Sequence, residues 1–469
     1  MHADAATARV STVSAVGNAC VADTPDAVAC LAALDHAGVP YCLVREYDLA
    51  HATPDSDVDF VVPPGRLPRD VGTALRAAAE DAGRVLVQAV DHDAAWSFVV
   101  CPRTPRSAHD FTHLDAWPAP DAGPYRFHSG TDFLVHRRWN GVAWVPAGAT
   151  EFGVVLTRRL VKRDLGPRHL RALAGLYGKD PAGCEFEVAR LWGPRTAAEL
   201  VSSMRANAWN DIVDRAPELR AELARRAART APLATVGRVL RRMLVRARHF
   251  VRPRHGIDVV FLGPDGAGKS TVMERLRAAV EAGFSGVEFH GGAPSLRQLR
   301  DGTYRTRTTL PTPGVLARPH GLPARAGTAS VLKAAYWFVY YVLGYHVTVR
   351  PALARGRLVL HHRHVVDALV DPRRYRYGGP RWLLALLWRL TPKPDLVILL
   401  DAPADVIRAR KSELPRAEIE RQLAAYRALV QAMRNGHVVD AGQSPARTVA
   451  DTAAIIVEFM ATRTARRFA

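Results

Sequence analysis

Closely spaced cysteines are missing from this chain, and their absence excludes two classes of protein. The five cysteines stand far apart, at Cys20, Cys30, Cys42, Cys101 and Cys184. No C-x-x-C pair is present that could hold a structural zinc ion, and no dense cysteine pattern indicates a disulfide framework. A reducing cytoplasm is therefore the compartment that we expect.

A long hydrophobic run is also missing, as is a targeting segment. The most apolar stretch, residues 334–349, is 16 residues long and includes several tyrosines and a histidine. That composition suits a buried helix better than a membrane span. The first residues carry no basic segment followed by an apolar block, so we expect no signal peptide. Both absences favour a cytoplasmic protein.

Acidic residues are scarce relative to basic ones. The chain has 64 Lys and Arg against 45 Asp and Glu, which gives a formal net charge of +19. Such an excess predicts an anionic partner, which could be a nucleotide, a polyphosphate, a nucleic acid or an acidic lipid surface. With 48% hydrophobic and 23% charged residues in 469 positions, the composition is otherwise that of an ordinary globular protein of two or three domains.

The order of expected strands and helices divides the chain into four parts. Residues 1–24 have no hydrophobic period and are expected to be disordered. Residues 25–177 mix strands and helices as an α+β domain does, and residues 178–254 are expected to form a helical, basic connector. From 255 to 469 strands alternate with helices, which predicts a three-layer α/β domain with a parallel sheet. Strands are expected at 41–44, 58–62, 85–90, 97–101, 258–262, 358–360 and 396–400.

A glycine-rich loop follows the strand expected at 258–262. Its residues are Gly263, Pro264, Asp265, Gly266, Ala267, Gly268, Lys269, Ser270 and Thr271. Glycines let the backbone curl so that successive amide groups point at phosphate oxygens, and the helix that follows adds the positive end of its dipole. Lys269 is expected to reach the β- and γ-phosphates of ATP, and the Ser270 hydroxyl to complete the Mg²⁺ shell. A glycine-rich turn without a ligand is the alternative.

Arginines are concentrated between residues 220 and 254. Eleven occur there, and apolar residues at helical spacing run through 233–247. One helix, 233–250, could thus be apolar on one side and basic on the other, as helices that lie on an anionic membrane or a nucleic acid are. Of these two partners we favour the membrane surface. The alternative is a helix between domains that packs on the C-terminal domain and leaves its arginines in water.

Four landmarks make residues 256–462 resemble the thymidylate kinase group of P-loop nucleoside-monophosphate kinases. The first is the glycine-rich loop with its internal acidic residue, and the second is an aromatic helix at 336–347. The third is the strand-end segment 361–364, and the fourth is the apolar strand 396–400 with the basic segment 408–411 after it. The resemblance implies an ATP-dependent kinase with Mg²⁺ as the metal.

The resemblance also assigns roles to individual residues. It implies that Asp265 faces the phosphate acceptor and that Arg363 contacts the acceptor's phosphate. The basic residues Arg408, Arg410 and Lys411 would close over the triphosphate as a lid. Phosphoryl transfer needs little covalent help and much neutralisation of charge, which a mobile cationic lid supplies while it expels water.

Two positions depart from the pattern of this group. His362 stands where the group carries an acidic residue, and Tyr341 stands where it carries an arginine for the nucleotide phosphate. Either the acceptor is not thymidine monophosphate, or activity is low or absent. Asp367 could supply the missing acid. Three nearby arginines could grip an anionic acceptor or form a solvated loop, namely Arg373, Arg374 and Arg376.

The N-terminal part resembles the nucleotidyltransferase-like fold in the order of its strands and acidic residues. Asp57 and Asp59 are two residues apart, so one strand would carry both on the same face. Asp115 would be the third carboxylate, and together the three would bind Mg²⁺ and the triphosphate of a nucleotide. The alternatives are a turn at 55–57 with Asp59 exposed on a strand, or a domain that binds without catalysis.

These patterns predict an ATP-dependent phosphotransferase that moves the γ-phosphoryl group to a small nucleotide-like or sugar-like acceptor. One alternative is an ATP-binding regulator or scaffold in envelope polysaccharide assembly, which His362 favours. Another is nucleotidyl transfer by the N-terminal domain, with the P-loop domain sensing ATP. A nucleic acid partner is not expected, and a homodimer is compatible with the sequence.

Overall fold

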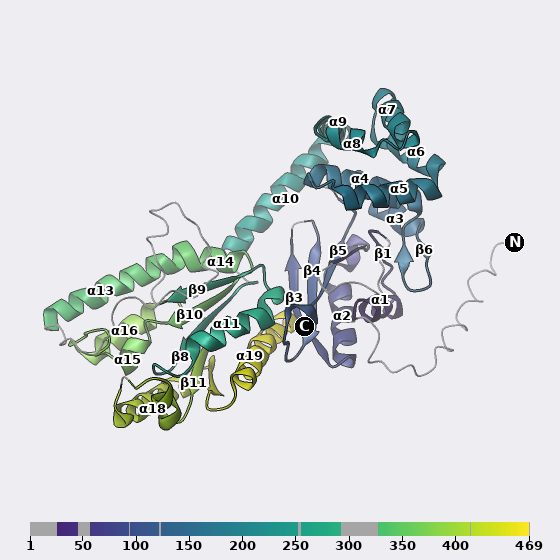
Figure 1. Ribbon diagram of the computed structural model, residues 1–469. Helices are drawn as coiled ribbons and strands as arrows, with labels where there is room; N and C mark the ends of the chain where they lie inside the picture. Colours follow the sequence, from purple (N-terminus) through teal and green to yellow (C-terminus); the bar gives the residue numbers. More distant parts are fainter. Residues whose placement is uncertain are drawn as a thin grey trace. The chain divides into compact units, whose positions relative to one another are not determined.

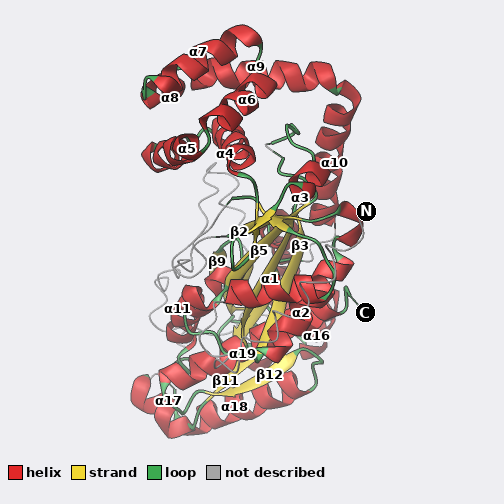
Figure 2. Ribbon diagram, turned by 90° about the vertical axis from the view of Figure 1, so that its right-hand side faces the viewer, coloured by secondary structure: helices red, strands yellow, loops and turns green. Residues whose placement is uncertain are grey.

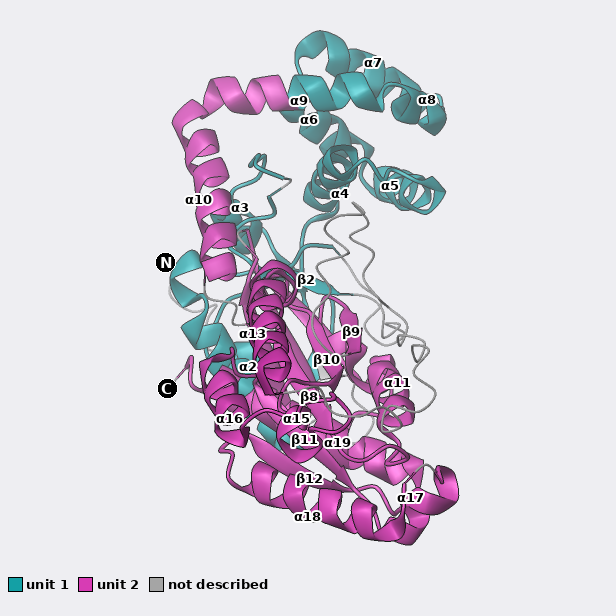
Figure 3. Cartoon of the chain, turned by 90° about the vertical axis from the view of Figure 1, so that its left-hand side faces the viewer, with its two compact units in different colours: residues 1–84, 116–223 teal, residues 85–115, 224–469 magenta. Residues whose placement is uncertain are grey.

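The computed structural model describes residues 26–45, 57–92, 94–121, 123–251, 255–291, 327–412 and 414–468. The chain forms two compact units, which are coloured separately in Figure 3. The first consists of residues 1–84 and 116–223, and the second of residues 85–115 and 224–469. The segment 1–24, which we expected to be disordered, lies outside the described residues, as do residues 55 and 56 of the acidic motif.

The first unit begins with short strands and amphipathic helices. Strand β1 (Cys42–Leu43) pairs antiparallel with β2 (Val58–Val61), which confirms strands in the two predicted segments. Helix α2 (Arg69–Asp81) buries Val71, Ala74 and Leu75 because residues three and four apart share one face. The other elements of this part are α1 (Asp26–His36), a 3₁₀ turn at Pro64–Arg66, α3 (Gly130–Val135), β6 (Arg138–Trp139) and β7 (Trp144–Val145).

Helices α4 to α8 and the first half of α9 complete the first unit around one hydrophobic core. Trp192 is fully buried there and donates its indole N–H to the carbonyl of Leu219 at 3.2 Å. Pro167, Pro181 and Pro194 each stand at the start of a helix, where a missing amide N–H costs no hydrogen bond. The helices are α4 (Gly148–Lys162), α5 (Pro167–Lys179), α6 (Pro181–Leu191), α7 (Pro194–Arg205), α8 (Trp209–Asp214) and α9 (Ala216–Thr230).

A five-stranded parallel sheet forms the centre of the second unit (Figure 1), in the order β12-β11-β8-β10-β9, and Figure 3 labels all five strands. All six residues of β8 are buried, as expected for a parallel sheet covered on both faces. The strands are β8 (Ile257–Leu262), β9 (Val287–Gly291), β10 (Leu358–Arg363), β11 (Leu396–Asp401) and β12 (Gly436–Asp440). The strands predicted at 258–262, 358–360 and 396–400 are confirmed, and the α/β class with them. The strand order reverses at β8, so ligands are expected beyond its carboxyl end.

Helices pack on this sheet and on one another. Helix α18 lies against β11 and β12, and α11 lies against α19 (Figure 2). Among the described residues, no helix combines the length and the apolar character needed to cross a bilayer. The helices are α10 (Pro232–Val251), α11 (Lys269–Val280), α13 (Gly327–Gly344), a π-helical turn at Tyr345–Val349, α14 (Arg350–Ala354), α15 (Asp367–Val370), α16 (Arg381–Leu390), α17 (Ala404–Arg410), α18 (Arg416–Gln431) and α19 (Pro445–Ala465).

The bounds of the N-terminal domain, 25–177, stay a prediction, although residues 85–115 are grouped with the second unit. The physical reason is hydrophobic burial, because Val87 and Phe111 lie in the same buried cluster as Met460. Thr464 also donates its hydroxyl to the carbonyl of Val87 at 2.7 Å. The sequence pattern identified strands at 85–90 and 97–101 but not the core on which they pack. The segment forms β3 (Arg84–Asp91), β4 (Trp96–Pro102) and most of β5 (Thr112–Trp117).

Candidate nucleotide-binding site

The glycine-rich loop connects β8 to α11 at the carboxyl end of the sheet. Gly263, Gly266 and Gly268 have φ angles of 138°, 92° and 91°, a region that side-chain-bearing residues rarely adopt. The loop is also crowded, since a Cβ on Gly263 would lie 2.9 Å from the carbonyl oxygen of Leu400. A Cβ on Gly266 would lie equally close, 2.9 Å, to the carbonyl oxygen of Ile407. The backbone therefore requires glycine at each of these positions, through its φ angle and, at Gly263 and Gly266, through a close carbonyl oxygen.

Lys269 is buried inside this loop. Its ammonium group donates to the carbonyl oxygens of Gly263 at 2.6 Å and Pro264 at 2.8 Å. Burial, followed by the charge of Arg363, lowers its pKa to about 8. A buried cation whose pKa is lowered gains most from an added anion, because the anion restores the preference for the charged form. The Lys269 side chain is thus placed where it would bind a phosphate group.

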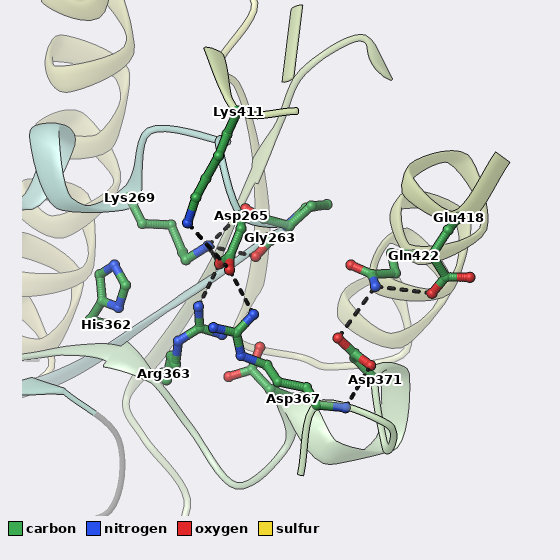
Figure 4. Close-up of polar contacts among 12 residues, drawn as sticks. Gly263, Asp265, Lys269, His362, Arg363, Asp367, Asp371, Lys411, Glu418 and Gln422 are labelled. Atoms are coloured by element: carbon green, nitrogen blue, oxygen red, sulfur yellow. Dashed lines mark hydrogen bonds and ion pairs between the residues drawn. The ribbon is translucent and has the colours of Figure 1, made fainter. Parts of the chain in front are cut away.

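Asp265 is the centre of a cluster of cations that we call the Asp265 cluster, composed of Asp265, Lys269, Arg363, Arg374 and Lys411. Figure 4 shows Lys269, Arg363 and Lys411 directed at the Asp265 carboxylate. Arg363 and Arg374 hydrogen-bond to its two carboxylate oxygens, the latter at 2.6 Å. The ammonium nitrogens of Lys269 and Lys411 lie 3.9 Å and 3.8 Å from the carboxylate. Burial alone would raise the pKa of Asp265, but Arg363, Lys269 and Arg374 hold it below its usual value. One carboxylate thus faces four cations, which leaves positive charge for a polyanionic ligand.

His362 occupies the place at the end of β10 where an acidic residue was expected. Its Nε2 atom lies 2.9 Å from the hydroxyl oxygen of Ser270 at the start of α11. Burial, and then the charge of Lys269, lower the pKa of His362 to about 3, so the imidazole is neutral at physiological pH. The residue that replaces the acid is therefore in direct contact with the predicted metal-binding hydroxyl.

Comparison with known proteins identifies relatives of part of the chain. The chain matches no model of a protein family. The thymidylate kinase of Ectopseudomonas mendocina (strain ymp) is 32% identical over 227 residues, which cover 43% of this chain and 95% of that relative. The thymidylate kinase of Pseudomonas fluorescens (strain Pf0-1) is 30% identical over 212 residues, 41% of this chain and 86% of the relative. The chain belongs to the thymidylate kinase family. The family assignment covers less than half of the chain, and the N-terminal resemblance stays a prediction.

Asp367, which we expected could replace the missing acid of the thymidylate kinase family, is buried at the start of α15. Its Oδ2 accepts the backbone N–H of His364 at 2.7 Å, and its Oδ1 accepts the hydroxyl of Tyr426 at 2.8 Å. Burial raises its pKa above the usual value, although Arg363 opposes this. Both oxygens are thus engaged within the protein, and the role of Asp367 as an acid stays a prediction.

Tyr341 also departs from the family pattern, and the structure places it inside the protein. It lies on α13, is 2% exposed, and its hydroxyl contacts Nε2 of His364. Burial raises the pKa of the hydroxyl well above its usual value. A tyrosine in this position therefore packs against the strand end and supplies no cation for a nucleotide phosphate.

The segment predicted as a lid lies partly beside the loop. Lys411 belongs to the Asp265 cluster, and Arg410 donates to the carbonyl oxygen of Ala441 at 3.1 Å. Arg408 and Arg410 are exposed at the end of α17. Of the three arginines after the strand end, Arg374 joins Asp265, whereas a role of Arg373 and Arg376 in holding an acceptor stays a prediction.

The three N-terminal carboxylates are not brought together as a metal site. Among the described residues, no group of three or more His, Cys, Asp or Glu side chains is placed to hold a metal ion. Asp59 on β2 accepts the indole N–H of Trp117 at 2.7 Å and pairs with Arg158 at 3.5 Å. Asp57 precedes β2 and is exposed, and Asp115 lies on β5. The described part of the chain thus shows no metal group at Asp57, Asp59 and Asp115, and their role in binding a metal and a nucleotide stays a prediction.

One buried pair within the parallel sheet was missed from the sequence. Asp258 on β8 and His361 on β10 lie on adjacent strands, with 2.9 Å between Oδ1 and Nε2. The ring of His290 on β9 stacks on that of His361, with centroids 5.1 Å apart. The available signal was an aspartate in an otherwise apolar strand, since a fully buried carboxylate requires a partner.

Proposed function

We propose that the P-loop unit is an ATP-dependent phosphotransferase whose acceptor is a small anionic molecule with a nucleotide-like or sugar-phosphate-like character. The observation that carries the proposal is the excess of cations in the Asp265 cluster beside the phosphate-binding loop. Four cationic side chains within 4 Å of a single carboxylate exceed what a structural ion pair needs. The thymidylate kinase relatives support the reaction class.

The chain's own residues divide the work of such a transfer. Lys269 and the loop amides would bind the β- and γ-phosphates, and Lys411 would approach from α17 over the transferred group. Arg363 and Arg374, held in place by Asp265, would bind the acceptor and orient it toward the γ-phosphate. Asp367 would fix the turn after β10 through its bonds to His364 and Tyr426, so that Arg363 keeps its direction.

Ser270 and His362 are the residues that would hold a divalent cation. A divalent ion bound there with the nucleotide would neutralise charge on the phosphate oxygens. The donor atoms present are a hydroxyl oxygen and an imidazole nitrogen, 2.9 Å apart. The pair fits a metal ion, although it lacks the carboxylate expected in this place.

A regulator or scaffold that binds ATP without turnover is the second candidate. Its support is the same substitution, because a carboxylate near Ser270 would add negative charge for the metal and the imidazole of His362 does not. Recruitment to a membrane surface would fit this role as well as the kinase role. A cytoplasmic location stays part of the proposal.

Transfer of label from γ-labelled ATP separates these candidates. The full chain is incubated with nucleoside monophosphates, sugars and sugar phosphates, and the Lys269→Ala and Asp59→Ala variants are run beside it. The kinase proposal expects labelled product that disappears only with Lys269→Ala. Loss only with Asp59→Ala would point to the N-terminal part, and ATP binding without any labelled product would support the regulator.

A further inference from the structure

Two donor atoms from distant parts of the sequence meet at the start of α11. Ser270 is the second residue of that helix, and His362 is the fifth residue of β10. Their Oγ and Nε2 atoms are 2.9 Å apart although 92 positions separate the residues. The pair therefore results from the fold of the P-loop unit and is adjacent to the loop that would bind phosphate.

This distance equals the spacing of neighbouring ligands on one octahedral ion. Ligands at about 2.1 Å from a metal and at right angles to each other are about 3 Å apart. The same 2.9 Å also fits a hydrogen bond from the Ser270 hydroxyl to His362. The two interpretations differ in one observable, which is whether a histidine nitrogen binds the metal.

The carboxylates of this region are engaged elsewhere. The two oxygens of Asp265 are hydrogen-bonded to Arg363 and Arg374. Those of Asp367 accept from a backbone amide and from Tyr426. Hard cations such as Mg²⁺ prefer oxygen ligands and keep their waters, whereas imidazole suits first-row transition metals. An imidazole in place of a carboxylate thus shifts the preference of the site from Mg²⁺ toward first-row transition metals.

We propose that His362 is a nitrogen ligand of the nucleotide-bound metal, and that this site selects Mn²⁺ over Mg²⁺. The inference rests on the proposed function only as far as metal-dependent binding of ATP. It does not need turnover, because the ligand set is a property of the bound complex. His362 thereby becomes a determinant of metal choice that the family resemblance alone does not provide.

The test is pulsed electron paramagnetic resonance of the full chain with Mn²⁺ and ATP. The expected result is a directly coordinated ¹⁴N coupling that disappears in His362→Ala and in His362→Asp. Calorimetry in parallel should show Mn²⁺ binding to the ATP complex more tightly than Mg²⁺, with the preference reduced about tenfold or more in His362→Asp. His437→Ala, which changes a histidine on β12, is the matched control and should leave the coupling intact.

The outcomes separate this inference from the proposed function. A complex that binds ATP with Mn²⁺ but shows no ¹⁴N coupling overturns the metal assignment and leaves the kinase proposal standing. A chain that binds no ATP with either metal overturns both. Melting temperatures of the variants without ligand show whether the coupling is lost only because a variant is misfolded.

A second, independent observation concerns the exposed face of helix α10. None of its residues is buried, and Leu233, Met243 and Leu244 are 86%, 63% and 69% exposed. Leu240 is 53% exposed and Val236 is 56% exposed. These apolar residues therefore lack cover among the described residues, whereas the C-terminal end of the helix contacts α14, where Arg350 donates to the carbonyl oxygen of Val251 at 2.7 Å.

The same helix is basic and contains no acidic residue. Its arginines are Arg238, Arg241, Arg242, Arg246 and Arg248. A helix with an apolar stripe, flanking arginines and no carboxylate matches the chemistry of a bilayer surface, which presents acyl chains beneath anionic headgroups. A nucleic acid would use the arginines but would leave the exposed leucines without a partner. We infer that α10 binds an anionic lipid surface with its axis in the plane of the membrane.

Sedimentation with vesicles tests this inference on the full chain. Binding is expected to vesicles of phosphatidylcholine with about 30% phosphatidylglycerol, at about tenfold higher affinity than to phosphatidylcholine alone. The double variant Leu240→Ser and Leu244→Ser should weaken binding, as should Arg241→Gln with Arg242→Gln. Equal binding of wild type and leucine variant to the anionic vesicles overturns the inference, as does binding to duplex DNA that exceeds binding to these vesicles.

Discussion

The two predicted phosphate-binding regions differ in how far the sequence determines them. In the loop at 263–271, all the required groups are neighbours in the chain, and three positive φ angles build the curl locally. In the N-terminal part, two carboxylates from one strand had to meet a third from another strand, and the described structure forms no such metal group. A site made from contiguous backbone can be predicted from spacing, whereas one made from distant side chains depends on the tertiary fold.

Asp265 and Asp59 show this difference at the level of single residues. Asp265 follows a strand and Asp59 lies on one, and both are paired with arginine. Asp265 is a residue of the phosphate loop and contacts four cations, which leaves positive charge for a ligand. Asp59 pairs with Arg158 and accepts from an indole, so its charge is balanced within the first unit. The first arrangement is suited to a ligand and the second to stability.

The largest effect should come from Lys269→Ala. Removing the buried ammonium group from the phosphate loop is expected to lower phosphoryl transfer by about 10²-fold or more, since it stabilises charge in the transition state. Steady-state turnover with γ-labelled ATP is the measurement, with Asp59→Asn as the matched control on the other carboxylate region. A similar loss in both variants would break the distinction between the two regions.

The second prediction concerns stability of the Asp265 cluster. Asp265→Ala leaves Arg363 and Arg374 without their carboxylate and should cost about 3 kcal/mol of folding stability. Inorganic pyrophosphate at millimolar concentration should restore much of it, because an anion can replace the lost charge. Differential scanning fluorimetry with and without pyrophosphate measures both. Asp405→Ala removes an exposed carboxylate paired with Arg416 and serves as the control with little effect.

The same division between local and distant contacts explains which features could be predicted from the sequence. The loop, three of the five parallel strands and the helix at 336–347 were predicted because each depends on local spacing or hydrophobic period, whereas β9 and β12 were not predicted. For Arg374 the sequence left open a role in gripping an acceptor or a place in a solvated loop, and its contact with Asp265, 109 residues away in the chain, could not be foreseen. The packing of β3 on the C-terminal core was missed for the same reason, because alternation identifies a strand but not its partner.

A third prediction contrasts Asp265 with Asp395, a carboxylate of the same unit whose burial is not offset by several cations. Burial raises the pKa of Asp395 to about 6 from 3.8, although the backbone N–H of Asp258 opposes this. The native state then binds the proton more strongly than the unfolded state. Its contribution to stability is present below pH 4 and is lost as the pH rises through about 6.

Asp395→Asn is therefore expected to stabilise the protein at a pH of about 7.5, by at most about 3 kcal/mol, and to change little at a pH of about 4. The asparagine oxygen can still accept from the amide of Asp258. Melting temperatures of both proteins across this pH range are the measurement. A variant that is less stable than the wild type at the higher pH would show that the native state favours the charged form of Asp395, which contradicts a raised pKa.

The smallest effect should come from Asp59→Ala in the first unit. It removes the acceptor of the Trp117 indole and the partner of Arg158, and should cost about 1 to 2 kcal/mol because a half-buried polar pair is lost. Asp57→Ala changes an exposed carboxylate two residues away and should shift the melting temperature little. Because neither residue is part of a described metal group, phosphoryl transfer and the affinity for Mn²⁺ should be unchanged in both variants. If Asp59→Ala instead abolished a divalent-cation-dependent activity while leaving the melting temperature intact, the N-terminal carboxylates would be a second catalytic site, and the contrast between the two regions would fail.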